Sequence, residues 1–374
     1  MPLTRRHALT ALGSLPILTA EPVLAQEAVA PAPTPDQALD SAFTQHQPPA
    51  LAGGIVTRED GLLWSGVRGV RRLGADAAAT VEDRWHIGSN TKAMTAAAHA
   101  RLVEMERVGW DTPFKDLFPE LPASAAWADI TVETLTNHRA GLSDDQRLSR
   151  DIRVAARTDT RELITQRLDI VRAALASDPT GTPGSFAYAN VNFVLVGAAI
   201  ERLTGQPWET ALGALVFAPL GIADYGFGAP TGDQPWGHQL QGDTLVPLDP
   251  ALMPDNPPLM GPAGTVNITI ADYAKWLRPF LDDGGDLLPP SVFERLLTPL
   301  PGPGRPYARG WAFLEGQAGA VGTLLVHEGS NTLWHTTTLV DPDGERAVFA
   351  VSNDDSRGGA ATQRLAAALL ALRA

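Results

Sequence analysis

The chain has 374 residues, of which 44% are hydrophobic and 19% are charged, a composition typical of a globular protein large enough for two lobes. Its formal net charge of −13 argues against a nucleic-acid partner, because phosphate binding requires a basic face. It contains no cysteine, which excludes disulfides, thiolate metal sites and a cysteine nucleophile.

The N-terminal residues 1–25 have the pattern of an export signal. A start containing Arg5 and Arg6 is followed by an apolar stretch and a V-L-A cleavage site. The arginine pair resembles a twin-arginine signal, so both the Sec and the twin-arginine routes stay open. A retained anchor is the weaker alternative, because the apolar stretch is short for a bilayer and is interrupted by Pro16. We therefore expect a periplasmic or secreted protein, with residues 26–35 as a linker.

Strand patterns occur at both ends of the remaining chain. After a short helix predicted over residues 36–45, residues 53–70 read as two strands around the turn R-E-D-G. Four more strand patterns follow near the C-terminus, namely W-A-F-L, G-T-L-L-V-H, H-T-T-T-L-V and A-V-F-A-V-S-N. The turn D-P-D-G joins the last two as a hairpin, and a helix over residues 360–372 closes the chain. Strands from both ends can share one antiparallel sheet.

The middle of the chain is predicted to be mainly helical. Apolar spacing indicates helices over residues 91–107, from 131 to at least 135, and over 191–203. The fold class is therefore α/β (α+β), an antiparallel sheet flanked by helices with an inserted helical lobe. We expect residues 36–85 and 265–374 to form the α/β lobe and residues 86–264 the helical one. A functional site is expected in a cleft between them.

Ser89 and Lys92 stand at the start of the helix predicted over residues 91–107. Their i, i+3 spacing puts both side chains on one helix face, where Lys92 can help to deprotonate the Ser89 hydroxyl. The N-terminus of the helix also favours negative charge developing there. In the alternative interpretation, Ser89 or Asn90 caps the helix and Lys92 is an ordinary polar residue of the first turn.

A second candidate pair, Tyr188 and Asn190, comes directly before a predicted helix. A tyrosine phenol beside a cation can shuttle a proton, and an asparagine can hydrogen-bond a substrate amide or carbonyl group. The alternative is a structural tyrosine followed by an asparagine that caps the helix.

The third candidate segment is His327-Glu328-Gly329, at the end of a predicted strand and followed by Ser330. A glycine at this position would let the backbone of a substrate lie close to the strand edge. By itself the pattern is weak, because residues 86–88 also fit it.

Other hydrolase signatures are absent from the sequence. It contains neither the Gly-x-Ser-x-Gly elbow nor a His-Glu-x-x-His metal motif. Several further histidines are scattered, and we interpret them as structural: His86, His99, His138, His238 and His335. We expect no metal and no cofactor.

In this order, Ser-x-x-Lys, Tyr-x-Asn and His-x-Gly resemble the motifs of the serine β-lactamase/penicillin-binding-protein superfamily. The similarity is strongest to its class C-like branch, which also contains esterases and D-amino-acid peptidases. The stretches L-T-N-H-R-A-G-L (residues 135–142) and G-P-A-G-T-V-N-I-T-I-A-D-Y-A-K-W-L (residues 261–277) resemble the family as well. The resemblance covers residues 36–372 and implies a β-lactamase/transpeptidase-like fold.

The resemblance also implies a role for each candidate residue. Ser89 would be the acylated nucleophile, with Lys92 and Tyr188 as the base system that takes and returns its proton. The backbone N–H groups of Ser89 and Ser330 would form the oxyanion hole. The implied substrate-binding positions are Asn190, His327, Gly329 and Ser330.

One departure from the family pattern affects the expected substrate. Strong β-lactamases have Lys-Thr-Gly where this chain has His327-Glu328-Gly329, and histidine is largely neutral at pH 7. We therefore expect an esterase or D-amino-acid peptidase rather than an efficient β-lactamase. The substrate would be a small ester, an amide or a peptidoglycan-derived peptide, and the enzyme a monomer. The alternative is a catalytically silent member that binds cell-wall peptide or another ligand, but all three motifs retain competent side chains.

Overall fold

The computed structural model describes residues 33–252, 254–317 and 319–372, so the predicted signal over residues 1–25 lies outside the described part. From Pro33 onward the chain forms one compact unit. Within the described residues, no helix combines the length and apolar character needed to cross a membrane. The division into two lobes at residues 85/86 and 264/265 stays a prediction.

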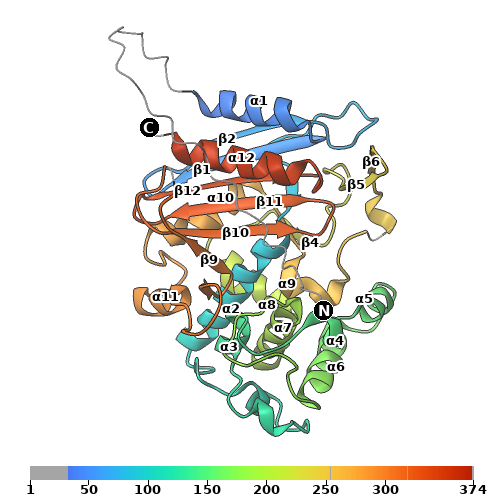
Figure 1. Cartoon of the computed structure of the whole chain (residues 1–374), viewed down its shortest axis with the longest axis vertical. Helices are drawn as coiled ribbons and strands as arrows, with labels where there is room; N and C mark the ends of the chain where they lie inside the picture. The colour runs from blue at the N-terminus through green and yellow to red at the C-terminus, as the bar shows by residue number, and fades with distance from the viewer. Residues whose placement is uncertain (1–32, 253, 318, 373–374) are drawn as a thin grey trace, which may run out of the picture. The chain divides into compact units, whose positions relative to one another are not determined.

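A seven-stranded antiparallel sheet joins the two ends of the chain, in the order β2-β1-β12-β11-β10-β9-β8 (Figure 1). Its strands are β1 Ala50–Thr57, β2 Gly61–Gly69, β8 Tyr307–Ala308, β9 Trp311–Leu314, β10 Leu324–Ser330, β11 His335–Asp341 and β12 Arg346–Ser352. Strand β1 pairs with β12 so that Gly53 lies opposite Ala350. This pairing confirms the expected antiparallel sheet shared by N- and C-terminal strands.

Two smaller sheets come from segments with short strands. The first has the order β3-β7-β4, with β3 Arg84–His86, β7 Val266–Thr269 and β4 Tyr225–Phe227. The second pairs β5 His238–Gln241 with β6 Thr244–Pro247. These strands are not predicted from the sequence, because three or four residues carry too little alternation to be recognised. Strand β3 leads directly into the turn that carries Ser89.

The helices predicted from apolar spacing are present. The observed helices are α1 Pro35–His46, α2 Thr91–Glu104, α3 Val132–Thr136, α4 Asp144–Arg147, α5 Arg150–Ala156, α6 Leu163–Leu175, α7 Asn190–Thr204, α8 Trp208–Leu212, α9 Gly261–Gly264, α10 Ile270–Leu277, α11 Pro290–Leu297 and α12 Gly358–Ala371. Helix α2 ends three residues before the predicted end, because Glu106 adopts a left-handed backbone with φ 55°.

The large sheet separates two hydrophobic cores. Helices α1 and α12 cover one face of it, and α10 packs on the other side (Figure 1). Along β1, Leu51 and Ile55 belong to the core with α12, whereas Ala52 and Val56 belong to the other core. This alternation is the period of two that a strand buried on both faces requires.

Helix α2 is buried on nearly every side in the larger core. Its alanines have small side chains, which allow α7 and α9 to approach it closely. The alanine-rich segment after Ser89 therefore places the nucleophile candidate at the end of a central, tightly packed helix.

Candidate active site

Ser89 lies in a single 3-10 turn, Gly88–Asn90, between β3 and α2. Asn90 occupies the N-cap position of α2, but its side chain makes no capping hydrogen bond. Its Nδ2 instead donates to the carbonyl oxygen of Ile87 (3.1 Å), and its Oδ1 accepts from the hydroxyl of Tyr273 (3.2 Å). Asn90 therefore stands at the cap position, but its side chain does not cap the helix as the alternative interpretation requires.

Lys92 is fully buried, and its amine points at Ser89. The Nζ atom lies 2.9 Å from Ser89 Oγ, 2.9 Å from Asn190 Oδ1 and 2.6 Å from the carbonyl oxygen of Ala263. All three partners are neutral oxygens that come from different parts of the chain. The amine is thus held in one position, directed at the hydroxyl of the candidate nucleophile.

Asn190 is oriented by Asp144, a residue that the sequence motifs do not indicate. Asn190 is the first residue of α7, after the N-cap residue Ala189, so Asn190 is not the helix cap of the alternative interpretation. Its Nδ2 donates to Asp144 Oδ2 (2.8 Å), and Asp144 Oδ1 accepts from the backbone N–H of Val191 (2.8 Å). Asp144 therefore fixes the amide so that its oxygen faces Lys92.

Tyr188 places its ring against the amine, with 4.9 Å between Lys92 Nζ and the ring centroid. The side chain is 45% exposed, and no hydrogen bond of its hydroxyl is present among the described residues. The ring of His138 packs against that of Tyr188, with 4.4 Å between the centroids, and His138 Nδ1 accepts from the backbone N–H of Ala189 (3.3 Å). Burial holds the pKa of His138 well below its usual value, so the imidazole is neutral. From the sequence alone, His138 is one of several scattered histidines with no indicated role at the site.

Strand β10 approaches the backbone of the nucleophile turn closely at Gly329 and Ser330. A Cβ atom on Gly88 would lie 2.7 Å from the amide nitrogen of Ser330, and one on Gly329 would overlap the carbonyl oxygen of Ile87. Gly88 also has a left-handed backbone with φ 52°. Glycine is therefore required on both sides of this contact, which brings the amide of Ser330 beside the turn of Ser89.

These motifs and their arrangement correspond to a known family. A family model described as Beta-lactamase matches residues 39–373. The chain belongs to the Beta-lactamase family. This membership confirms the resemblance derived from the three motifs.

Two curated proteins and one solved structure illustrate the relationship. Penicillin-binding protein 4 of Amycolatopsis lactamdurans is 28% identical over 250 residues, which cover 66% of this chain and 62% of that protein. Esterase EstB of Burkholderia gladioli is 31% identical over 186 residues, 46% of each chain. A D-stereospecific amidohydrolase from Streptomyces sp. has a similar structure, with a TM-score of 0.67, 24% identity and coverage of 88% of this chain and 96% of that one. The chain spans about half the length of most curated relatives it matches.

In this Beta-lactamase family member, His327 is buried and uncharged. Burial, with a further contribution from the positive charge of Lys92, lowers the pKa of His327 to about 3. Its Nε2 lies 3.1 Å from the hydroxyl of Tyr307, whose pKa burial raises well above its usual value. The protonated phenol can therefore donate to the imidazole. At neutral pH this position supplies no positive charge to a substrate.

A cavity of about 320 Å³ opens beside Tyr188 and His327. Strand β9 pairs with β10 only over Leu324–Val326, so among the described residues the following part of β10 has no strand partner on that side. The cavity is lined by Phe186, Tyr188, Arg305, Tyr307, Ala312, Leu314, Val326, His327 and Glu328. Arg305 is the one permanent cation in this lining. The cavity thus joins aromatic walls, a cation and the open edge of β10.

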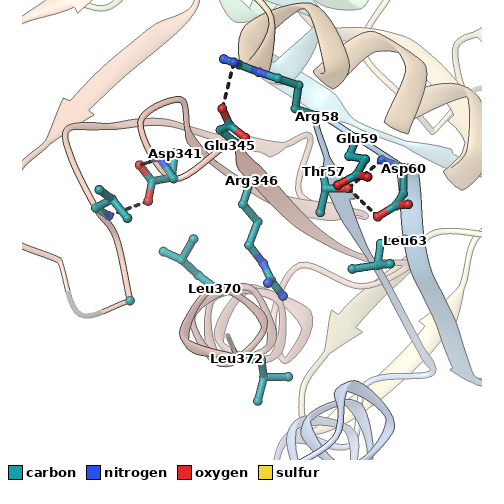
Figure 2. Close-up of a pocket in the computed structure, with 13 residues that line it drawn as sticks. Thr57, Arg58, Glu59, Asp60, Leu63, Asp341, Glu345, Arg346, Leu370 and Leu372 are labelled. Atoms are coloured by element: carbon teal, nitrogen blue, oxygen red, sulfur yellow. Dashed lines mark hydrogen bonds and ion pairs between the residues drawn. The ribbon is translucent and has the colours of Figure 1, made fainter. Parts of the chain in front are cut away.

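A second hollow, of about 450 Å³, lies at the other end of the strands (Figure 2). Its rim is formed by the β1–β2 turn and by the β11–β12 turn, where Arg58 pairs with Glu345 at 2.9 Å. Asp341 accepts hydrogen bonds from backbone N–H groups, including that of Gly344 (3.1 Å). None of the three motifs contributes a residue to this hollow, so the chemistry belongs to the site around Ser89.

Proposed function

We propose that this chain is a serine hydrolase that cleaves esters or amides through an acyl-enzyme on Ser89. The observation that carries the proposal is the distance of 2.9 Å between Lys92 Nζ and Ser89 Oγ, with the amine fully buried and aimed at the hydroxyl. Two relatives, one named as an esterase and the other as a D-stereospecific amidohydrolase, support the same reaction class. We also propose that the chain belongs to the class C-like branch of the superfamily.

In the proposed reaction, Ser89 Oγ attacks the acyl carbon while its proton passes to the Lys92–Tyr188 pair. The backbone N–H groups of Ser89 and Ser330 stabilise the oxyanion, a contribution of about 3 kcal/mol for one such donor in other hydrolases. The bond to the leaving group then breaks, and the proton moves to the departing oxygen or nitrogen. A water molecule attacks the acyl-enzyme by the reverse path, which releases the acid and restores the Ser89 hydroxyl.

The neutral state of His327 favours esters and D-amino-acid amides or peptides over β-lactams. A permanent cation at this position would bind a substrate carboxylate, whereas a buried imidazole with a pKa of about 3 cannot. The substrate we propose is therefore a small ester, an amide or a peptidoglycan-derived peptide. We also propose that residues 1–25 direct export, and that the enzyme acts as a monomer outside the cytoplasm.

The decisive experiment is a pre-steady-state assay of the full chain with p-nitrophenyl acetate, quenched and mapped by mass spectrometry. We expect a burst of nitrophenol and an acetyl group on Ser89, both abolished in Ser89→Ala. Ser185→Ala, a serine substitution in the loop before Tyr188, is the matched control and should retain the burst. A wild-type chain without burst or adduct would favour the alternative, a catalytically silent binding protein.

Arg305 is expected to select for substrates that carry an anionic group. It lines the cavity beside Tyr188 and has no ion pair or hydrogen bond among the described residues, whereas Glu328 in the same lining accepts from Gln363 at 2.7 Å. An exposed charge pair contributes up to about 1 kcal/mol, so Arg305→Gln should lower the preference for an anionic ester about threefold to fivefold.

This selectivity is measured as a ratio of kcat/KM values. One pair compares p-nitrophenyl hydrogen succinate with p-nitrophenyl butanoate, and a second compares 3-acetoxybenzoate with phenyl acetate, so that the charge lies on the acyl or on the leaving side. Arg364→Gln, an exposed arginine on α12, removes the same charge elsewhere and should change neither ratio. If both ratios also stay constant in Arg305→Gln, the cavity does not select for charge.

A further inference from the structure

His86 is a buried histidine three residues before Ser89 that hydrogen-bonds the nucleophile turn. Its Nδ1 accepts from the backbone N–H of Gly88 (3.1 Å), and its Nε2 lies 2.9 Å from Asp255 Oδ2. Because Nδ1 is an acceptor, the ring proton is on Nε2 and is donated to the carboxylate. The ring also stacks on Trp334, with 5.3 Å between the centroids. The imidazole is thus fixed in one tautomer and one orientation.

The second oxygen of Asp255 holds the segment that follows Ser330. Asp255 Oδ1 accepts from Asn331 Nδ2 at 2.5 Å. Asn331 Oδ1 in turn accepts from the backbone N–H groups of Leu333 (3.2 Å) and Trp334 (3.1 Å), which defines the turn between β10 and β11. The Asp255 carboxylate therefore contacts both His86, which holds the backbone of Gly88, and Asn331, which holds the turn after Ser330.

Asp255 is only 5% exposed, so its carboxylate oxygens need hydrogen-bond donors from the protein in place of water. Besides His86 and Asn331, the backbone N–H of Asn256 donates to Oδ1 (2.6 Å). All of these donors are neutral groups. The carboxylate therefore acts by fixing the positions of its donors rather than by pairing with a positive charge. The hydrogen bond to His86 is a restraint on the left-handed backbone of Gly88.

We propose that Asp255, acting through His86 and Asn331, is a positioning residue that fixes the backbone amides of Ser89 and Ser330 relative to each other. This inference rests on the proposed acyl-enzyme function, in which these two amides bind the oxyanion. It assigns a role to a loop residue more than 160 positions away from the nucleophile in the sequence. None of the three residues touches the reacting atoms.

Two substitutions of His86 separate the two hydrogen bonds. In His86→Asn the side-chain oxygen can take the place of Nδ1 and accept from Gly88, whereas in His86→Gln the amide can replace Nε2 but leaves Gly88 without an acceptor. We expect the acylation rate to fall about 10- to 100-fold in His86→Gln, the effect of a displacement of up to about 1 Å, with KM little changed. His86→Asn restores the acceptor for Gly88 but loses the hydrogen bond to Asp255, so its rate should lie between those of His86→Gln and the wild type. A wild-type rate in His86→Asn would show that Asp255 does not act through His86.

Asp255→Asn tests the carboxylate directly. An amide offers one acceptor atom in place of two, so either His86 or Asn331 loses its partner. We expect acylation to slow as in His86→Gln. Asp249→Asn removes the same charge from an exposed position on the same loop and is the matched control, with an unchanged rate.

The burst distinguishes positioning from folding, because its amplitude counts folded active sites and its rate reports their geometry. A reduced rate at full amplitude supports the proposal, as does a partial rescue of the rate in His86→Asn relative to His86→Gln. A reduced amplitude at an unchanged rate would show that the network serves stability alone and would overturn it. Equal losses of rate in His86→Asn and His86→Gln would overturn the role of the Nδ1 acceptor.

A second readout does not require activity. In the full chain labelled with 15N-glycine and 15N-serine, the Gly88 and Ser330 amide signals should move in Asp255→Asn, and the Gly88 amide should exchange faster in His86→Gln. Unmoved signals would overturn the proposed network. If instead the wild type shows no burst while these signals do move, the proposed function fails and the network stands.

Discussion

Replacing Lys92 with methionine should lower the rate of Ser89 acylation by about 10³-fold, within the range that a positioned general base contributes. The amine is 2.9 Å from Ser89 Oγ, and methionine has a similar length but can neither take a proton nor stabilise an alkoxide. The Lys92 side chain is fully buried, so an apolar side chain fits in its place without exposing new surface. Burst kinetics with p-nitrophenyl acetate give the rate, and a thermal melt shows that the variant is folded.

Further variants identify which property of Lys92 is used. Lys92→Arg keeps a positive charge but cannot accept a proton in the accessible pH range, so it should remain impaired. In Lys92→Ala, ethylamine added to the assay should restore part of the rate. Lys275→Met, an exposed lysine on α10, is the control for loss of a lysine and should have the wild-type rate. An active Lys92→Arg would contradict proton transfer through this amine.

The sequence predicts the sheet and the motif residues because their signals are local. Strands β1 and β12 alternate between two cores, and the turn before β12 is recognisable in four residues. Ser89 and Lys92 are close in space because they are one helical turn apart. Wherever a contact follows from spacing within one element, a single sequence suffices to predict it.

The residues that support the motifs could not be found in this way. Asp144 orients Asn190 across 46 positions, and Asp255 bonds His86 across 169. Neither acid lies in a recognisable pattern, and histidines 86 and 138 appeared scattered because their partners are remote. Such contacts follow from the packing of distant segments, which composition and periodicity do not encode.

Gly329 has a structural role that the sequence alone does not reveal. Its lack of a side chain suggested room for a substrate along the strand edge. In the structure, the atom that approaches it is the carbonyl oxygen of Ile87, two residues before Ser89. The glycine is therefore needed for the contact between β10 and the nucleophile turn, whether or not a substrate is bound.

Gly329→Ala should consequently reduce acylation about 100-fold and also destabilise the chain by about 1–3 kcal/mol. A Cβ at this position would overlap the carbonyl oxygen of Ile87, so β10 and the turn of Ser89 must separate. That separation moves the Ser330 amide away from the oxyanion that Ser89 would generate, and KM should change less than kcat. Burst kinetics and urea unfolding measure the two effects.

Gly316→Ala distinguishes general backbone strain from this specific contact. Gly316 also has a left-handed backbone, with φ 67°, but a Cβ there meets no atom within 4 Å. Its substitution should cost about 1 kcal/mol of stability and leave acylation unchanged. If Gly329→Ala lost the expected stability but acylated at the wild-type rate, the Ser330 amide would not be an oxyanion donor. The donor beside Ser89 would then have to come from another segment, and the close approach of β10 would serve only its packing against the Gly88–Asn90 turn.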